Sequence, residues 1–159
     1  MQQIYNALKD LDIQYQEHSH PAVYTSAEAA EYYKDFPGAK VKSLFLRNRK
    51  GTQHYLVVLT DQKKADLKEL SKILGESQVG FASPERLQKY LHVTPGSVSP
   101  LGLVFDEDKH VQVILDEAIM EHELINAHPN INTKTIIMKV ADLQRYIAHT
   151  GHTAQTLPF

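Results

Sequence analysis

The stretch Gly38-Ala-Lys-Val-Lys-Ser-Leu-Phe-Leu-Arg-Asn-Arg-Lys-Gly51 places a lysine on the apolar side of a predicted strand. Because side chains alternate along a strand, Lys42 points to the same side as Leu44 and Leu46. A lysine among leucines has to find an anionic partner, change its pKa, or reach water past its neighbours. The pattern leaves two interpretations open: a functional lysine in a pocket, or a strand lysine whose ammonium extends into solvent.

The same stretch predicts a β-hairpin from which the rest of the fold extends. Residues 40–47 and 53–60 have the pattern of strands, and Asn48-Arg-Lys-Gly51 between them supplies a glycine for a tight turn. The second strand is apolar on both faces, so we expect it to be central and covered. Outward from this hairpin, we expect helices at 2–11, 25–34, 66–74, 84–90 and 142–149, and strands at 13–17, 79–82, 111–115 and 133–138.

These elements predict the fold class and the domain organisation. Strands and helices mingle without a regular alternation, which indicates one α+β, or mixed α/β, domain around a largely antiparallel sheet. The domain spans residues 1–159, and we expect a loose C-terminal tail from about residue 151.

Composition restricts the class of function. The chain has 159 residues, 42% hydrophobic and 23% charged, with a net charge of −2, which argues against binding to polyanions over the whole surface. A local basic patch remains open, because residues 38–51 contain five Lys or Arg and no acidic residue. The absence of cysteine excludes disulfides, thiolate zinc sites and cysteine nucleophiles. Without a secretory signal or an apolar stretch near the ~20 residues of a membrane span, we expect a cytoplasmic protein that does not enter membranes.

Two loops carry residues suited to binding chemistry. Pro95-Gly96-Ser97-Val98 offers backbone N–H groups beside a hydroxyl, which suits a carbonyl or an oxyanion, although a simple turn has the same composition. His128-Pro-Asn-Ile-Asn-Thr133 brings an imidazole, two amides and a hydroxyl to the start of a strand, and an ordinary surface loop is the alternative. His18 with His20, and His149 with His152, are the closest histidine pairs, but neither has a third metal ligand at a suitable spacing. We expect the second pair to be solvated.

The order of these segments resembles the YbaK/ProX family of aminoacyl-tRNA editing domains, and most closely its freestanding ProXp-ala, or PrdX, type. The similarity covers nearly the whole chain. The segments that carry it are His20-Pro-Ala-Val-Tyr-Thr25, Pro37-Gly-Ala-x-x-Lys42-x-Leu-Phe-Leu-Arg47, Val93-x-Pro-Gly-Ser-Val-x-Pro100, Val-x-Val-Ile-Leu-Asp116 and Glu121-His-Glu-x-x-Asn-x-His-Pro-x-x-Asn-Thr133. The resemblance implies a single YbaK-like domain with a barrel-like sheet surrounded by helices.

The resemblance also implies an activity: hydrolysis of an amino acid wrongly attached to tRNA, characteristically alanine on proline tRNA, without a metal, a cofactor or a protein nucleophile. By similarity, the catalytic residues are Lys42, which binds the terminal phosphate–ribose region, Gly96 and Ser97, which hold the carbonyl and the water, and His128, which places the aminoacyl group. The expected substrate-binding residues are Val23, Tyr24, Thr25, Ser43, Pro95, Asn132 and Thr133, and the expected tRNA-binding residues are Lys40, Arg47, Arg49 and Lys50. The expected partners are the acceptor end of mischarged tRNA and, transiently, prolyl-tRNA synthetase, with the protein acting as a monomer.

Some departures from the family pattern leave the amino acid open. Ser43 follows the lysine where many alanine-specific relatives have Asn, and Lys134 interrupts a run of small residues. Editing of another amino acid, such as cysteine on proline tRNA, is therefore an alternative. Two further alternatives are a module that binds the aminoacyl-tRNA end without turnover and a small-molecule ester or amide hydrolase that does not use tRNA.

Overall fold

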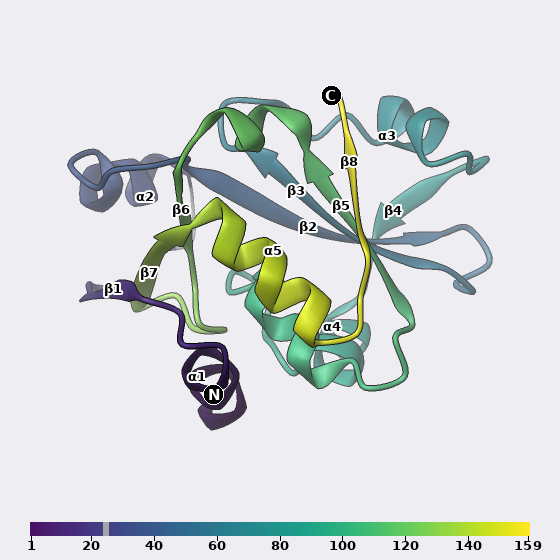
Figure 1. Cartoon of the computed structure of the whole chain (residues 1–159). Coiled ribbons are helices and arrows are strands. Elements are labelled where there is room, and N and C mark those ends of the chain that lie inside the picture. Colours follow the sequence, from purple (N-terminus) through teal and green to yellow (C-terminus); the bar gives the residue numbers. More distant parts are fainter. Residues whose placement is uncertain (24–25) are drawn as a thin grey trace.

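The computed structural model describes residues 1–23 and 26–159, and its elements follow one another along the chain as Figure 1 shows. The helices are α1 (Gln2–Asp10), α2 (Ser26–Tyr33), α3 (Leu67–Ile73), α4 (Pro84–Leu91) and α5 (Val140–His149), with short 3-10 helices η1 (Pro100–Phe105) and η2 (Glu117–Glu121). The strands are β1 (Tyr15–Ser19), β2 (Val41–Asn48), β3 (His54–Thr60), β4 (Val79–Phe81), β5 (Val111–Asp116), β6 (Leu124–Ala127), β7 (Lys134–Lys139) and β8 (Ala154–Leu157).

The strands form two sheets, which confirms the mixed α/β class. A three-stranded antiparallel sheet has the order β1-β7-β6, and a five-stranded sheet has the order β4-β2-β3-β5-β8. The two sheets meet where Ala39, just before β2, bridges to Ile125 of β6. The five-stranded sheet is mixed, because β5 pairs in parallel with both β3 and β8. Parallel neighbours need long crossover connections, and helices occupy the crossovers here.

Of the six strand pairings that the structure describes, four are antiparallel, which confirms the expectation of a largely antiparallel arrangement. Among the described strands, neither sheet closes into a barrel. The two sheets are joined by hydrogen bonds at Ala39 and by the larger core cluster that they share. The hairpin that the sequence predicts is present: β2 and β3 pair antiparallel from Val41 with Thr60 to Arg47 with His54. At the turn, the Asn48 side chain accepts hydrogen bonds from the N–H groups of Thr52 and Gln53.

Apolar residues on the two faces of the five-stranded sheet form separate core clusters. The larger cluster fills the space between the sheets and is covered by α1, α4, α5 and η1. The smaller cluster contains Leu46, Tyr55 and Val57 and packs against Leu70 of α3. Strand β3 contributes to both clusters, so its central, covered position is confirmed. Among the described residues, no helix is of the length and apolarity that a membrane crossing needs.

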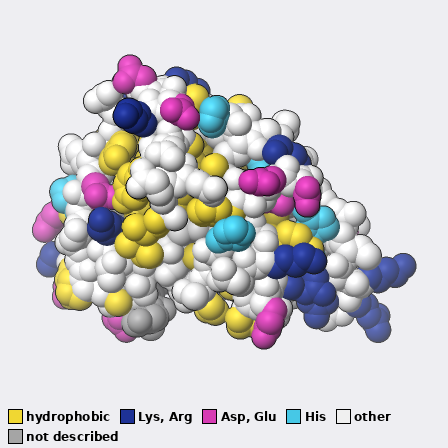
Figure 2. Space-filling model, turned by 90° about the horizontal axis from the view of Figure 1, so that it is seen from below, with side chains coloured by type: hydrophobic (Ala, Val, Ile, Leu, Met, Phe, Trp, Pro, Cys, Tyr) yellow, Lys and Arg dark blue, Asp and Glu magenta, His cyan; other side chains and the backbone are white. Residues whose placement is uncertain are grey.

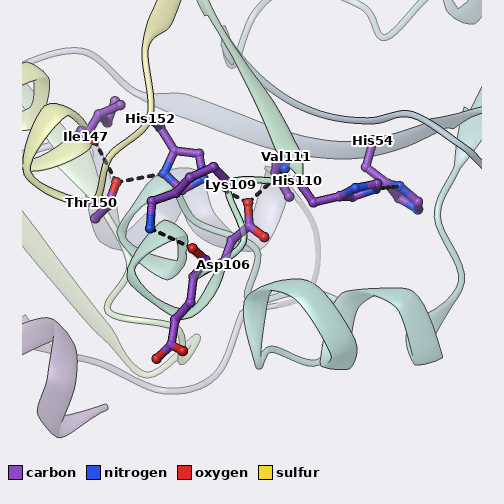
Figure 3. Close-up of polar contacts among 9 residues, drawn as sticks. His54, Asp106, Lys109, His110, Val111, Ile147, Thr150 and His152 are labelled. Carbon is purple, nitrogen blue, oxygen red and sulfur yellow. Dashed lines mark hydrogen bonds and ion pairs between the residues drawn. The ribbon is translucent and has the colours of Figure 1, made fainter.

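The C-terminal segment is part of the fold, which corrects the expected loose tail. Strand β8 pairs with β5 from Ala154 opposite Val113 to Leu157 opposite Asp116. His152, expected to be solvated, is only 6% exposed. Its Nε2 lies 2.8 Å from a carboxylate oxygen of Asp106 and its Nδ1 lies 2.9 Å from the Thr150 hydroxyl, as Figure 3 shows. This buried contact fixes the start of β8 against the loop before β5.

Candidate active site

The structure has a pocket around Lys42, the lysine that the sequence pattern places on an apolar strand face. It has a volume of about 220 Å³ and lies where the start of β2, the end of β6, the 96–100 loop and the end of α2 meet. Its described lining consists of Val23, Tyr33, Lys40, Val41, Lys42, Ser43, Gly96, Val98, Ser99, Pro100, Asn126, Ala127, His128 and Thr135. The structure thus brings together three of the four predicted catalytic residues, Lys42, Gly96 and His128, and two predicted wall residues, Val23 and Ser43.

The wall at the junction of the sheets depends on close backbone packing at Gly38. A side-chain carbon at Gly38 would lie 2.7 Å from the carbonyl group of Leu124, and the residue has a φ of +97°. Both features require glycine. Two side chains donate hydrogen bonds to the backbone carbonyl groups around Gly38. Asn126 Nδ2 donates to the carbonyls of Pro37 (2.9 Å) and Ala39 (3.3 Å), and the ammonium of Lys40 donates to that of Gly38 (3.0 Å).

His128 has a defined tautomer because its two ring nitrogens face different groups. Nδ1 lies 3.0 Å from the carbonyl oxygen of Lys134, which only accepts, so Nδ1 carries the hydrogen. Nε2 is then an acceptor, and the Tyr33 hydroxyl lies 3.3 Å from it. Burial lowers the pKa of His128 and the neighbouring His20 adds to this effect, while the bond to Lys134 opposes it. His128 therefore presents a neutral, accepting nitrogen at neutral pH.

A second layer of polar and aromatic groups supports this side of the pocket. His20 Nδ1 lies 2.9 Å from the carbonyl of Pro21, and its Nε2 lies 2.9 Å from the hydroxyl of Thr135, which lines the pocket. The His20 ring also contacts the edge of Tyr33, with 5.4 Å between ring centroids. These contacts connect β7, α2 and the segment before α2, so they fix the positions of Tyr33 and Thr135.

Lys42 lines the pocket, and it lies on the face of β2 that the sequence pattern predicts. It shares that face with Leu44 and Leu46, which pack in the smaller core cluster. Its ammonium donates a hydrogen bond to the backbone carbonyl of Lys63, in the loop before α3. Lys63 in turn forms a 2.8 Å ion pair with Asp116, a fully buried carboxylate. The lysine is thus held by a polar partner at the border of the apolar face.

Asp116 holds the loop that receives Lys42. Besides Lys63, its carboxylate accepts hydrogen bonds from the N–H groups of Thr60 (3.2 Å) and Ala118 (3.0 Å). Burial alone raises the pKa of Asp116, but the bonds from Lys63, Ala118 and Thr60 outweigh it and the pKa lies below its ordinary value. The carboxylate is therefore ionised and pairs with Lys63 at neutral pH.

Other predicted site residues lie around the pocket or away from it. Ser97 is buried behind Gly96, its N–H donates to the Thr94 carbonyl at 3.2 Å, and it is outside the described lining. Asn132 supports the wall indirectly, since its Nδ2 donates to the carbonyl of Val23 at 3.1 Å. Pro95 and Thr133 are exposed beside the pocket loops. Tyr24 and Thr25 are outside the described residues.

The structure also adds residues that the sequence pattern did not identify as site residues: Tyr33, Asn126 and Thr135. Asn126 was visible only as one position of the family-like segment before His128. Among the residues that the structure describes, no group of three His, Asp or Glu side chains has an arrangement suited to a metal ion.

The predicted tRNA-binding residues are divided between two places. Lys40 lines the pocket, whereas Arg47, Arg49 and Lys50 are at the β2–β3 turn. Figure 1 shows this turn at the opposite end of β2 from α2, and Figure 2 shows Lys and Arg side chains gathered at the corresponding end of the molecule. Arg49 and Lys50 are exposed, and Arg47 contacts the Arg49 carbonyl at 3.3 Å. The strand rise places Arg47 about 16 Å from Lys42.

Comparisons with known proteins agree with this geometry. The family model for the aminoacyl-tRNA editing domain matches residues 20–146. The chain is 39% identical to a prolyl-tRNA editing protein ProX of Acetoanaerobium sticklandii, over 94% of this chain and 92% of the relative. It is 33% identical to a prolyl-tRNA synthetase associated domain-containing protein of Danio rerio, over 96% of this chain and 83% of the relative.

A solved structure has the same fold. It is named as a candidate trans-editing enzyme for prolyl-tRNA synthetase, is 22% identical and superposes with a TM-score of 0.72, covering 99% of this chain and 96% of the other. At this identity the likeness concerns the fold alone. The matched family model and the curated relatives confirm the resemblance found in the sequence: this chain belongs to the aminoacyl-tRNA editing domain family.

Proposed function

We propose that this protein removes alanine that has been attached by mistake to proline tRNA, acting in trans to prolyl-tRNA synthetase in the cytoplasm. The observation that carries the proposal is the pocket around Lys42, Gly96 and His128 in a chain 39% identical to a prolyl-tRNA editing protein. Membership of the editing family makes the protein an aminoacyl-tRNA hydrolase. The identity of the amino acid is the part that needs testing.

The groups in the pocket suit hydrolysis of an ester by an oriented water. An aminoacyl ester is already activated, so positioning a water and stabilising the developing negative charge on the carbonyl oxygen provide sufficient catalysis. Gly96 exposes loop backbone beside the pocket, and Lys40 and Lys42 supply positive charge at its lining. In this account Lys42 exchanges its bond to the Lys63 carbonyl for one to the terminal phosphate or ribose of the tRNA.

The proposal of alanine over proline rests on the walls of the pocket. Val23 is buried in the wall and Ser43 lines the pocket, so together they limit the space for the amino acid side chain. Attraction distinguishes one methylene by only about 1–3 kcal/mol, whereas a clash with a packed wall excludes a larger side chain more strongly. In this proposal the aminoacyl side chain lies against Val23, which leaves room for a methyl group and blocks the proline ring.

The basic β2–β3 turn supports tRNA as the carrier of the ester. Arg49 and Lys50 are exposed at the β2–β3 turn, and in this proposal they contact the tRNA beyond its terminal nucleotide. Their contribution would be sequence-independent attraction of phosphates, which decreases as salt is added. We propose that the protein acts as a monomer and meets the synthetase only transiently.

Steady-state deacylation tests the proposal. The protein is incubated with Ala-tRNA(Pro) and, in parallel, with an alanyl ester of a short nucleotide analogue, and release of alanine is followed against an enzyme-free control. We expect rapid release from the tRNA and slow release from the analogue. Protection of the ester on the tRNA would instead indicate a binding module, and equal rates on both substrates would indicate a hydrolase that does not use tRNA.

A further inference from the structure

The basic β2–β3 turn continues onto helix α4 and forms one basic surface with it. This basic surface consists of Arg47, Arg49 and Lys50 at the turn and Arg86 and Lys89 on α4. Arg86 donates a hydrogen bond to the Gly51 carbonyl at 3.3 Å, which attaches the start of α4 to the turn. Three of the four arginines of the chain are in this surface, and Figure 2 shows Lys and Arg side chains gathered at this end of the molecule.

The two half-buried arginines of the basic surface donate hydrogen bonds to neutral groups. Arg47 donates to the backbone carbonyls of Asn48 and Arg49, at 3.3 Å each. Arg86 Nη1 lies 2.9 Å from Nε2 of His54. Because arginine only donates, this nitrogen of His54 accepts and the ring hydrogen is on Nδ1. The guanidinium groups are therefore held in place while their charges are not neutralised.

His54 stays neutral beneath the basic surface. It is fully buried, its Nδ1 lies 2.7 Å from Nε2 of His110, and Figure 3 shows the two rings side by side. Burial lowers the pKa of His54 to about 4, and His110 and the cations Arg86, Arg47 and Lys89 add to this effect. The charged side chains that act on this buried ring are thus cations, so the surface above it is positive.

Ion pairs do not offset this positive charge. Among the residues that the structure describes, no Asp or Glu forms an ion pair with a member of the basic surface, and Glu85, one turn before Lys89, is included in this statement. The fourth arginine, Arg145, by contrast pairs with Asp142 at 2.8 Å. Like charges gathered in one place repel one another, so binding of a polyanion would relieve this repulsion.

The aromatic side chains beside these cations contact one another. The rings of Phe45 and His54 are stacked, with 5.6 Å between their centroids, and the ring of Tyr90 stacks on that of His110 at 4.6 Å. The ammonium of Lys89 lies 5.2 Å from the centroid of the Tyr90 ring. Single-stranded nucleic acids are usually bound by stacking of bases on free aromatic faces, whereas contacts to phosphates position a protein on a double helix. The basic surface therefore suits the backbone of a duplex.

Strand β2 and helix α4 both connect the basic surface to the pocket. Strand β2 begins beside the pocket, which Lys42 lines, and Arg47 is near its end. Helix α4 ends at Leu91, and the chain then enters the loop whose Gly96 lines the pocket. The Cα atoms of Lys42 and Arg47 are about 16 Å apart by the strand rise, and the phosphates of a stacked strand follow at about 3.4 Å along its axis. The basic surface is thus several nucleotides away from an ester bound in the pocket.

We infer that Arg86 and Lys89 of α4, together with the β2–β3 turn, bind the phosphate backbone of the base-paired acceptor stem of the tRNA whose esterified end occupies the pocket. The inference rests on the proposed function, because it places a charged tRNA end in the pocket. Arg86 also attaches α4 to the turn, so its replacement would alter the fold locally. Lys89 is exposed and contacts the face of Tyr90, which makes it the better residue to replace.

Binding of uncharged RNA tests the inference without turnover. One probe is a hairpin with the acceptor-stem sequence of proline tRNA and its unpaired end, and the other is the 3′ strand of this stem without its complement. Dissociation constants are measured between about 50 and 200 mM salt. In Lys89→Ala we expect the hairpin to bind about fivefold more weakly at low salt, and the dependence of log K on log salt to decrease by about 1. Binding of the unpaired strand should not change.

Lys68→Ala is the matched control. Lys68 is an exposed lysine on α3, which packs through Leu70 against the other face of the five-stranded sheet. Its substitution should leave both the dissociation constants and their salt dependence unchanged. Lys89→Arg, which keeps the charge, should bind the hairpin as the wild type does. Thermal unfolding of each variant confirms that equal amounts of folded protein are compared.

The outcomes separate the inference from the proposed function. Hairpin binding by Lys89→Ala with the affinity and salt dependence of the wild type would overturn the inference, while deacylation by the wild type still supported the function. An equal loss of binding to the hairpin and to the unpaired strand would overturn the assignment to the base-paired stem. Wild-type protein that deacylates no charged tRNA would overturn the proposed function and, with it, the assignment of the basic surface to tRNA.

Discussion

The ammonium group of Lys42 donates a hydrogen bond to the backbone carbonyl of Lys63. This carbonyl belongs to a loop that the buried Asp116 fixes through its 2.8 Å ion pair with the Lys63 side chain. In the free protein, the ammonium group of Lys42 therefore has a neutral hydrogen-bond acceptor, although the residue lies on an apolar strand face. A phosphate is a stronger acceptor for an ammonium than a carbonyl is, so the arrangement can release Lys42 when the tRNA end arrives.

Replacing Lys42 with alanine should impair the reaction itself. We expect deacylation of Ala-tRNA(Pro) to fall by at least about a hundredfold, as when a single charge-stabilising donor is lost from an active site. Arg49→Ala, at the far end of β2, should mainly weaken tRNA binding and reduce the dependence of log K on log salt by about 1. Rates and binding at several salt concentrations distinguish the two. Equal, small effects would indicate that Lys42 is only a structural lysine.

Enlarging the pocket should relax its selectivity. Val23 is 5% exposed in the pocket wall, so Val23→Ala should give room for the proline ring and raise hydrolysis of Pro-tRNA(Pro) relative to Ala-tRNA(Pro) by about tenfold or more. Val113→Ala, a buried substitution of the same kind outside the described lining, serves as the control for a general loss of packing. The prediction fails if both variants change the ratio equally.

The pH dependence of the reaction should report on His128. Burial lowers the pKa of His128, so the ring stays neutral and accepting down to a pH below its ordinary value of about 6.5. We expect kcat/KM, corrected for spontaneous hydrolysis, to be maintained from pH 7 to 6.5 and to decline only at lower pH. In His128→Gln this acidic decline should disappear together with most of the activity. A decline centred above pH 6.5 in the wild type would contradict the neutral ring.

Acid should loosen the attachment of the C-terminal segment at Asp106. Burial alone raises the pKa of Asp106, but hydrogen bonds from the His152 side chain and from the N–H groups of Val111 and His110 outweigh it, so the pKa lies below its ordinary value. Since the folded-state pKa is depressed, the stabilisation is fully present above the unfolded value of about 3.9 and is lost as the pH falls through the folded value.

Unfolding in urea at pH 7 and at pH 3 measures this effect. Wild-type protein should lose stability between the two, whereas Asp106→Asn should be less stable at pH 7, by about 1–3 kcal/mol, and should lose less on acidification. Asp108→Asn, an exposed neighbour, is the control. An identical pH dependence in wild type and Asp106→Asn would show that the contact with His152 does not stabilise the fold.

Short sequence patterns correctly predicted the starts of helices, because a capping residue acts within one helical turn. Asp66 accepts hydrogen bonds from the N–H groups of Lys68 and Glu69 at the start of α3, and Ser83 caps α4, as their positions in the sequence indicate. Strands β6 and β8 were missed because each is only four residues long, and their pairing with β7 and β5 depends on the packing of the whole domain.

The site was predictable to a similar extent. Lys42, Gly96 and His128 belong to loops or strand ends with unusual composition, and the pocket unites them. Tyr33 and Thr135 have the sequence context of ordinary helix and strand residues, so only the meeting of α2 with β7 shows their role. Ser97 had the composition of a site residue, but the turn directs it into the protein interior.

The most direct test of the account is a deacylation panel in which one proline tRNA carries alanine, cysteine, serine or proline. The reaction is followed at a fixed concentration of protein, with an enzyme-free control for each ester. The account predicts that the alanyl ester is hydrolysed fastest and that the prolyl ester remains intact. Hydrolysis of the prolyl ester at the rate of the alanyl ester would contradict the account, and a preference for the cysteinyl ester would assign the pocket to a different amino acid.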